Sequence, residues 1–233
     1  MNHLKQAKQS LEKHQKIMLE TLNSITIDTH WFRRVFHTFA SCFLLYYMLP
    51  DEPLITLGKQ LLALTCLAII ILLEALRLKG ILPTGHFFGL RQYETTRPAS
   101  YLYFGSAMVM LLVFFPQQIA IPCILCGCFA DPIIGEIRMR YTQTLGLIAG
   151  FLVCMFLFSI TWYTAPLMVI ILVSLIGSLA ALCGETIKRW WIDDDFLIQM
   201  LPALAITFLY LVATTQGLSI LPHELIQPSL VFW

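Results

Sequence analysis

Acidic and basic residues are scarce in this chain, so those beside its apolar segments are the first candidates for chemistry. Asp131 follows the apolar run 121–130, and Pro132 and Gly135 follow it closely. Proline lacks a backbone N–H and glycine relaxes the local dihedral angles, so the sequence predicts a broken helix here. A carboxylate beside freed backbone groups is typical of a metal or phosphate site, so Asp131 is a candidate for one. The alternative is that Asp131 caps the next helical turn.

A second acidic group precedes the last apolar segment and consists of Asp193, Asp194 and Asp195. Three adjacent carboxylates repel one another unless a cation is near, and Mg²⁺ typically takes one or two protein carboxylates together with substrate phosphates. The nearby Lys188 offers a further positive charge. The structural alternative is that Asp195 is the N-cap of the last helix.

Other charged side chains are expected at the same depth as these carboxylates. Arginine forks bind phosphate oxygens, while carboxylates hold a metal or accept the proton of an attacking hydroxyl. The candidates are Glu94, Arg97, Arg138, Arg140 and Glu185, together with Arg33, Arg34 and His37 at the start of the first apolar segment. Glu74 and Arg77 stand one helical turn apart and are expected to form a structural ion pair.

The elements that must position these residues are membrane-spanning helices. The 233 residues are 58% hydrophobic and 12% charged, whereas about 25% of residues are charged in soluble domains. A spanning helix needs about 20 apolar residues. Seven apolar stretches are present, at about 35–49, 54–76, 101–116, 119–134, 145–163, 167–183 and 196–213. We therefore expect an all-α, polytopic membrane protein with about seven transmembrane helices in a single domain, residues 31–233.

Positive charge is distributed unevenly between the connections. Of the 15 Lys and Arg residues, 14 precede the first stretch or follow the second, fourth or sixth, and only Lys59 breaks the pattern. Short loops rich in Lys and Arg stay in the cytoplasm, so we expect the N-terminus inside and the C-terminus outside. The chemistry-bearing residues then face the cytoplasm. A net charge of +1 gives no basic field that would indicate a nucleic-acid partner.

Two further features have structural interpretations. Residues 1–30 carry apolar side chains at helical spacing among polar ones, which predicts an amphipathic cytoplasmic helix or, alternatively, a loose tail. Cys123, Cys126 and Cys128 imitate the spacing of metal ligands, but no second pair or nearby His completes a zinc set. We expect these cysteines to be packing residues and expect no disulfides.

Several segments occur in an order that resembles a known family. They are the basic pair and His of 33–37, Glu74–Arg77, the loop 94–103 (ETTRPASYLY), the segment 129–135 (FADPIIG), and Glu185 with Asp193–Asp195. Together they resemble the membrane-bound polyprenol kinase family, which includes dolichol kinase, phytol kinase and the CTP-dependent diacylglycerol kinase. The chain has Ala130 where the family usually has Gly, Gln143–Thr144 where it has Lys–Thr or Lys–Ser, and Asp195 where it has Asn.

The resemblance implies that a phosphoryl group passes from CTP to a lipid alcohol (a polyprenol, a dolichol-like alcohol or diacylglycerol) on the cytoplasmic face, with Mg²⁺. The roles expected on this basis are catalysis by Asp131, Glu94 and Asp194, metal binding by Asp131, Asp193, Asp194, Asp195 and Glu185, and nucleotide binding by Arg97, Arg138, Arg140, Thr144 and Lys188. The alternatives are a phosphatidate cytidylyltransferase-like enzyme, a small transporter that uses intramembrane carboxylates, and a non-catalytic membrane partner.

Overall fold

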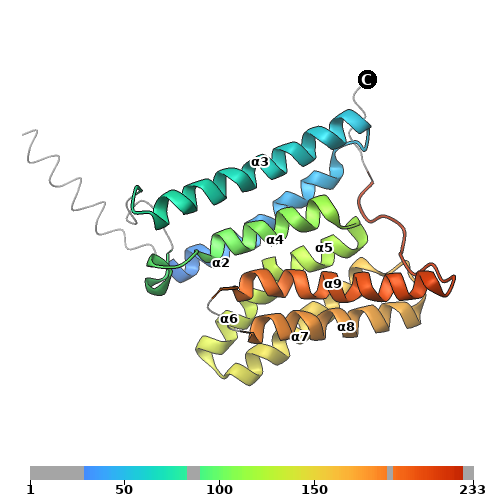
Figure 1. Cartoon of the computed structure of the whole chain (residues 1–233). Helices are drawn as coiled ribbons and strands as arrows, with labels where there is room; N and C mark the ends of the chain where they lie inside the picture. The colour runs from blue at the N-terminus through green and yellow to red at the C-terminus, as the bar shows by residue number, and fades with distance from the viewer. Residues whose placement is uncertain (1–28, 83–89, 188–190, 228–233) are drawn as a thin grey trace, which may run out of the picture.

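The computed structural model describes residues 29–82, 90–187 and 191–227. These residues form helices joined by turns, and no β-strand occurs among them. The helices run side by side as a bundle (Figure 1). The expectation of an all-α fold is confirmed. The amphipathic helix or tail expected at 1–30 lies almost wholly outside the described residues.

Five helical segments are long and apolar enough to cross a membrane. They are α3 (Pro53–Leu78), the continuous unit Gln117–Arg140, α7 (Gln143–Thr161), α8 (Leu167–Thr186) and α9 (Asp194–Thr215). The helix α4 (Ser100–Phe114) is apolar but shorter, and the first segment is divided into α2 (Thr29–Phe39) and the 3-10 helix η1 (Ala40–Met48). The chain is therefore a helical membrane protein, while the count of seven spans stays a prediction.

The unit Gln117–Arg140 corrects the expected helix break. It consists of α5 (Gln117–Leu125), a π-helical turn η4 (Cys126–Ala130) and α6 (Asp131–Arg140), with no interruption at Asp131 or Pro132. Pro132 stands in the first turn of α6, where a missing N–H costs little. The N–H of Asp131 bonds to the carbonyl of Cys126, five residues earlier, so the π-turn absorbs the irregularity. Such π-turns are frequent at functional sites in helices.

Capping residues explain where several helices start. The Asp193 side chain caps α9 by accepting a hydrogen bond from the N–H of Asp195, so Asp193, and not Asp195, is the N-cap. Asp194 and Asp195 lie in the first turn of α9, where negative charge favours the helix dipole. Thr142 caps α7 in the same manner. At the end of α3, Gly80 adopts a φ of 72°, a left-handed conformation that suits glycine.

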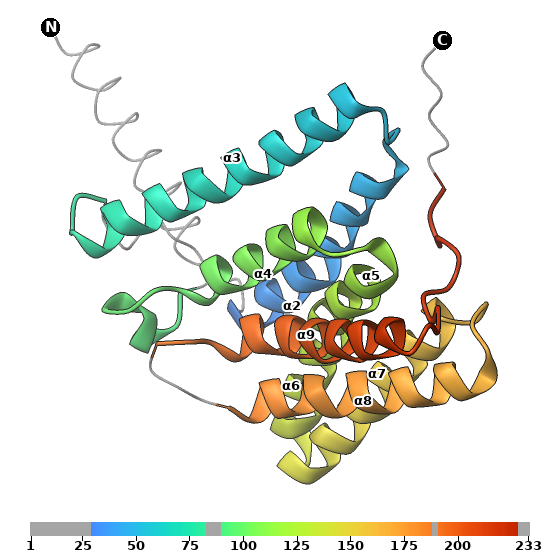
Figure 2. The same ribbon diagram turned by 45° about the vertical axis from the view of Figure 1, so that its right-hand side comes forward.

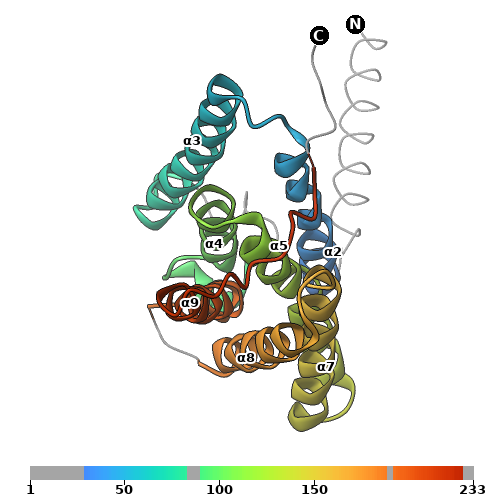
Figure 3. The ribbon, with the colours of Figure 1, turned by 90° about the vertical axis from the view of Figure 1, so that its right-hand side faces the viewer.

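The helices differ in how deeply they are buried. The most apolar window of Gln117–Arg140 is 61% buried, whereas that of α3 is 11% buried. The unit Gln117–Arg140 is therefore central and α3 is peripheral. Figures 2 and 3 show α3 standing apart from α7 and α8. The main helix contact of α3 is with α4, and α9 packs against α8, α4 and α5.

One end of the bundle gathers the charged residues, and we call it the polar end. It is the end at which α2, α4 and α9 begin and α3 and α8 finish, on the left in Figure 1. The short 3-10 helix η3 (Gln92–Thr95) lies in the loop between α3 and α4 at this end. A cluster there draws on segments that are far apart in the sequence.

Candidate functional site

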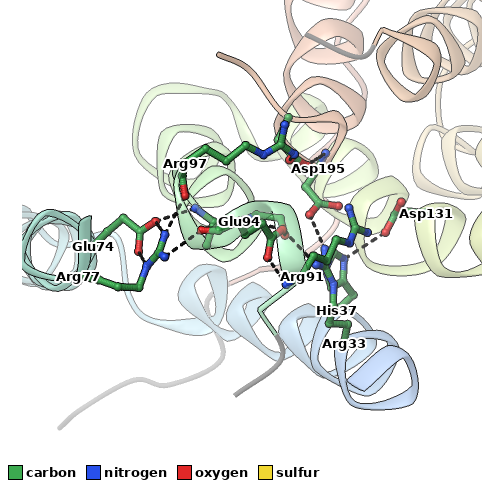
Figure 4. A network of polar contacts seen from close by, with 12 residues as sticks. Arg33, His37, Glu74, Arg77, Arg91, Glu94, Arg97, Asp131 and Asp195 are labelled. Atoms are coloured by element: carbon green, nitrogen blue, oxygen red, sulfur yellow. Dashed lines mark hydrogen bonds and ion pairs between the residues drawn. The ribbon is translucent and has the colours of Figure 1, made fainter. Parts of the chain in front are cut away.

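Arg33 of α2 joins two acidic side chains that are distant in the sequence. Its Nη1 lies 3.3 Å from Oε1 of Glu94, and its Nη2 lies 3.2 Å from Oδ2 of Asp195. Figure 4 shows the guanidinium group between the loop that carries Glu94 and the start of α9. Because the two nitrogens of a rigid fork engage separate carboxylates, Arg33 fixes the distance between these two elements.

His37 stands one turn after Arg33 on the same face of α2 and lies near the carboxylates of Asp131 and Asp195. Its Nδ1 lies 3.4 Å from Oδ2 of Asp131, although this nitrogen makes no hydrogen bond. Potential ligand atoms of His37, Asp131 and Asp195 all lie within 4.8 Å of one another. His37 and Asp195 are buried and Asp131 is partly exposed, so the group opens to solvent on the Asp131 side.

The second compact acidic group is the one at the start of α9. Asp193, Asp194 and Asp195 offer carboxylate oxygens that also lie within 4.8 Å of one another. Burial, a hydrogen bond with Asp194 and repulsion from Asp195 raise the pKa of Asp193 to about 8. Arg97 supplies partial compensation, with its Nη2 at 3.5 Å from Oδ2 of Asp193. Arg97 and Arg33 therefore reach two of the three acidic side chains, Asp193 and Asp195.

Glu185, at the end of α8, completes the acidic side of the site. Arg138 donates from Nη1 to its Oε1 at 3.0 Å, while its buried Oε2 has no hydrogen-bond partner. Asp131 and Asp194 are close enough to repel its charge. A buried carboxylate oxygen without a donor is costly unless a proton or a cation approaches it. This oxygen is therefore a position at which a proton or a cation would be stabilised.

A close helix crossing brings Glu185 to α9. At Gly184 an added Cβ would lie 2.6 Å from the carbonyl carbon and oxygen of Leu197, a distance that side-chain carbons do not tolerate. Only glycine therefore allows α8 to approach α9 this closely. The residue next to Gly184 is Glu185, so this contact determines how near Glu185 comes to the first turn of α9.

The predicted ion pair between Glu74 and Arg77 is confirmed and holds the loop before α4. Arg77 donates from Nε and Nη2 to both carboxylate oxygens of Glu74, at 2.8 and 2.5 Å. Arg77 also donates to the backbone carbonyls of Glu94 and Arg97, both at 2.8 Å. These buried groups attach the loop to the end of α3 (Figure 4). The pair thereby holds Glu94 and Arg97 in position.

Glu94 is buried and engaged on both oxygens. The Ser100 hydroxyl donates to Oε1 at 2.6 Å, and the N–H of Arg91 donates to Oε2 at 2.8 Å. Burial alone would raise the pKa of Glu94, but these hydrogen bonds and the charge of Arg33 outweigh it and hold the pKa below its ordinary value. A carboxylate of this kind is a weak proton acceptor, and its ion pair with Arg33 holds that guanidinium group beside the loop.

Two cavities meet at α2. An apolar groove of about 1050 Å³ runs between α2–η1, α3 and α4, and a polar cleft of about 60 Å³ lies beside α6. The cleft is lined by Arg33, Arg34, His37, Arg91, Asp131 and Pro132. Its volume corresponds to about two waters at about 30 Å³ each. Arg33 and His37 line both cavities, so a polar group at the end of the groove would face the cleft.

The structure gathers most of the predicted site residues at the polar end. Those with charged neighbours there are Asp131, Glu94, Asp193, Asp194, Asp195, Glu185, Arg97 and Arg138. Arg140 is largely exposed and pairs with Glu136, which also pairs with Arg34. Thr144 is exposed near the start of α7, and Lys188 lies outside the described residues.

Five of the six residues that line the polar cleft have none of the roles expected from the sequence. They are Arg33, Arg34, His37, Arg91 and Pro132. The spacing of Arg33 and His37, one helical turn apart, was the available signal, because residues four apart share a helix face. Nothing in the sequence around Arg91 distinguished it from an ordinary basic loop residue.

Comparisons of the chain with models of protein families, with curated proteins and with solved structures found no match. The assignment of a function therefore depends on the geometry of the site and on the resemblance of its short motifs.

Proposed function

We propose that this protein is a membrane-embedded lipid-alcohol kinase. It transfers the terminal phosphoryl group of a nucleoside triphosphate, CTP by the resemblance, to the hydroxyl of a polyprenol, a dolichol-like alcohol or diacylglycerol. One observation carries the proposal: an apolar groove and a small polar cleft share Arg33 and His37. A lipid in the groove would present its hydroxyl where arginine and carboxylate groups converge.

The residues of the cleft suit phosphoryl transfer to an alcohol. The hydroxyl oxygen attacks the terminal phosphorus, the bond from that phosphorus to the bridging oxygen breaks, and the nucleoside diphosphate leaves. Asp131 faces the cleft, is partly exposed and accepts the hydroxyl proton. Arg33 and Arg91 neutralise the phosphate charges. Positioning and charge neutralisation are the main sources of rate enhancement in this reaction class.

The acidic residues fit a divalent cation. The three carboxylates at the start of α9 supply the oxygen ligands that Mg²⁺ prefers. The unpartnered oxygen of Glu185 adds a further acceptor beside them. When bound, Mg²⁺ would neutralise charge on the phosphate oxygens. Asp193, Asp194, Asp195 and Glu185 would hold it, with Arg97 and Arg138 limiting their mutual repulsion.

We propose that the polar end faces the cytoplasm. Apart from Lys59, every described Lys and Arg lies at or beside this end, and such residues favour the cytoplasmic side. The seven apolar segments would each cross the membrane, with α2–η1 as the first and α4 as the third. The N-terminus is then inside, the C-terminus outside, and the site is accessible to cytosolic nucleotide.

The position of the carboxylates favours a kinase over a transporter. A transporter with intramembrane relays would need acidic groups near the middle of the bilayer. Glu74, Asp131 and Glu185 all lie toward the polar end instead. A cytidylyltransferase would use the same groups, and only its products differ.

Isotope position distinguishes the two reactions. Purified protein in detergent is incubated with Mg²⁺, with polyprenol, diacylglycerol or phosphatidate, and with CTP labelled in either the γ- or the α-phosphate. A kinase moves the γ-label into the lipid, whereas a cytidylyltransferase moves the α-label. ATP labelled in the γ-phosphate tests the choice of nucleotide.

Two carboxylate-to-amide variants control this experiment. Asp131→Asn is expected to lower transfer of the γ-label by about 100-fold, because proton acceptance and charge placement are lost together. Glu52→Gln changes an exposed carboxylate at the opposite end and should leave the rate unchanged. Undiminished transfer by Asp131→Asn would remove Asp131 from the mechanism, and the absence of transfer to every lipid would refute the kinase proposal.

A further inference from the structure

The apolar groove is bounded by one continuous face of α3. The residues of α3 that line it recur at helical spacing and are Lys59, Leu62, Ala63, Cys66, Ile70 and Leu73. From Lys59 to Leu73 the helix rises about 21 Å at 1.5 Å per residue. Because α3 makes its main helix contact with α4, the space between α3 and η1 stays unfilled. The groove is long, and at about 1050 Å³ it lies at the upper end of ligand-site volumes.

The two ends of the groove are charged and its length is apolar. Where the groove reaches the polar end of the bundle, it is lined by Arg33, His37 and Glu94. At the opposite end the Nζ of Lys59 lies 2.6 Å from Oδ1 of Asp51 and 4.9 Å from the ring centre of Tyr46. We call Lys59, Asp51 and Tyr46 the end cluster. The side chain of Lys59 is 5% exposed and that of Asp51 is 61% exposed, so water solvates this ion pair through Asp51.

The length of the groove restricts what can fill it. Half of a hydrocarbon core of about 30 Å is about 15 Å, which is the depth available to the chains of an ordinary two-chain lipid. A groove of about 21 Å runs past the middle of the bilayer. An occupant that follows it from end to end is a single linear chain longer than one leaflet. The exposed apolar side chains of η1 and α3 along its margin, such as Phe43 and Leu62, allow entry from the side.

We infer that the groove holds the hydrocarbon chain of a single-chain lipid alcohol, and that the end cluster limits the length of chain that fits. The identity of the head group as a hydroxyl rests on the proposed function. Hydrocarbon pressed against Lys59 would remove water from a charged pair without replacing its hydrogen bonds. Chains that stop short of the end cluster are therefore favoured, and longer ones must bend out into the bilayer.

Two exposed cysteines provide a test that needs no nucleotide. Cys66 lines the groove, about 10 Å along α3 from Leu73, while Cys183 is exposed on α8, which does not line it. In proteins that lack Cys42, which is also exposed and lines the groove, and that retain only one of the two, N-ethylmaleimide alkylation is timed with alcohols of graded chain length. Chains that reach past Cys66 should slow its alkylation at least 10-fold and leave Cys183 unchanged, whereas shorter alcohols and diacylglycerol should protect Cys66 weakly.

Two glycine variants test whether protection requires the groove itself. Gly105 lines it, and a Cβ there would meet only Ile70 at 3.7 Å, so Gly105→Leu fits the backbone and fills the space. Gly58→Leu is the matched control, since Gly58 has no neighbour within 4 Å and does not line the groove. Protection of Cys66 should be lost in the first variant and kept in the second. An unchanged Cys183 rate and elution volume show that both variants are folded.

Removal of the positive charge tests the end cluster. Lys59→Met keeps the approximate length of the side chain, and Asp51 stays solvated. In the unaltered groove, half-protection of Cys66 should need the lowest alcohol concentration at an intermediate chain length. In Lys59→Met, the chain length that needs the lowest concentration should be longer. An unchanged length profile would overturn the limiting role of the end cluster.

The remaining outcomes separate this inference from the kinase proposal. Protection without phosphoryl transfer under any condition supports the groove and overturns the kinase. Transfer without protection of Cys66 overturns the groove as the chain site while the kinase stands. Equal protection by diacylglycerol, or protection that increases with protein concentration without lipid, overturns the inference by making the occupant a bilayer lipid or a second copy.

Discussion

Arg33 has the most informative contacts of any single residue at the polar end. It reaches a loop carboxylate and a helix carboxylate with different nitrogens, and it lines both cavities. In the proposed reaction, Arg33 holds Glu94 and Asp195 at a set distance from each other and offers positive charge to a phosphate.

Arg33→Lys is a direct test of this bridging role. A lysine has one ammonium group and cannot engage two separated carboxylates as a planar fork does. We expect phosphoryl transfer to fall about 10-fold to 100-fold while the protein still elutes as a folded species. A control Lys79→Arg change, at an exposed residue after α3, should have little effect. Equal rates for Arg33→Lys and the unaltered protein would contradict the bridging role.

The hydrogen bonds of Glu94 predict a pH dependence of stability. Since the folded-state pKa of Glu94 lies below its ordinary value of 4.5, the unfolded state binds the proton more tightly. The contribution of Glu94 is therefore complete above about pH 4.5 and is lost as the pH falls through the folded-state pKa. Glu94→Gln should lower stability at pH 7 by about 1–3 kcal/mol and flatten the acid limb of the thermal stability profile.

Thermal unfolding in detergent across the acid range measures this effect. The control is Glu224→Gln, an exposed carboxylate in the C-terminal segment, which should preserve both the stability at pH 7 and the acid limb. An acid limb of unchanged steepness in Glu94→Gln would show that the groups responsible lie elsewhere.

At the scale of elements, the helix crossing at Gly184 connects packing to the site. The backbone of α9 lies where any side chain at this position of α8 would be. Gly184→Ala should force the helices apart and destabilise the protein by about 1–3 kcal/mol. It should also lower transfer more than stability alone explains, since Glu185 moves with α8. Melting temperature and turnover below the melting range measure the two effects.

The control for this change is Gly58→Ala, where an added Cβ meets nothing within 4 Å. Alanine there should be neutral or stabilising by about 0.5–1 kcal/mol, because glycine is the poorer helix former. If Gly184→Ala behaved like Gly58→Ala, the close crossing would not constrain the site.

Element positions were predictable from the sequence, but the irregular junctions were not. Apolar runs located the helices, because length and hydrophobicity suffice to identify them. The break expected at Asp131 and Pro132 was wrong, because a π-turn inside the buried unit accommodates the proline. The N-cap of α9 shifted from Asp195 to Asp193, a difference that depends on backbone geometry and not on residue type.

At the scale of the whole molecule, the proposed orientation places the two ends on opposite sides of the membrane. Tyr141, exposed in the turn after α6, belongs to the polar end, and Glu52, exposed before α3, belongs to the opposite end. In a background without Cys42, Cys66 and Cys183, cysteine is introduced at either position. A membrane-impermeant thiol reagent added outside intact cells should label the Glu52 position alone, and lysis should expose the Tyr141 position.

Labelling of both positions from one side would contradict the orientation. Labelling of the Tyr141 position from outside would place the site away from cytosolic nucleotide. The native cysteines that remain are buried and serve as the unlabelled background.

The amino-acid sequence by itself determined that this is a helical membrane protein and that its charged residues have a shared preference for one side, since composition and charge placement act locally. It also singled out Asp131, Glu185 and Asp193–Asp195, because ionisable groups beside apolar helices are costly to keep. Only the tertiary structure decided that Arg33 and His37 contact these carboxylates, that Glu94 pairs with Arg33, and that a long groove ends beside them. These features depend on distances between segments up to 162 residues apart, and helix packing alone sets such distances.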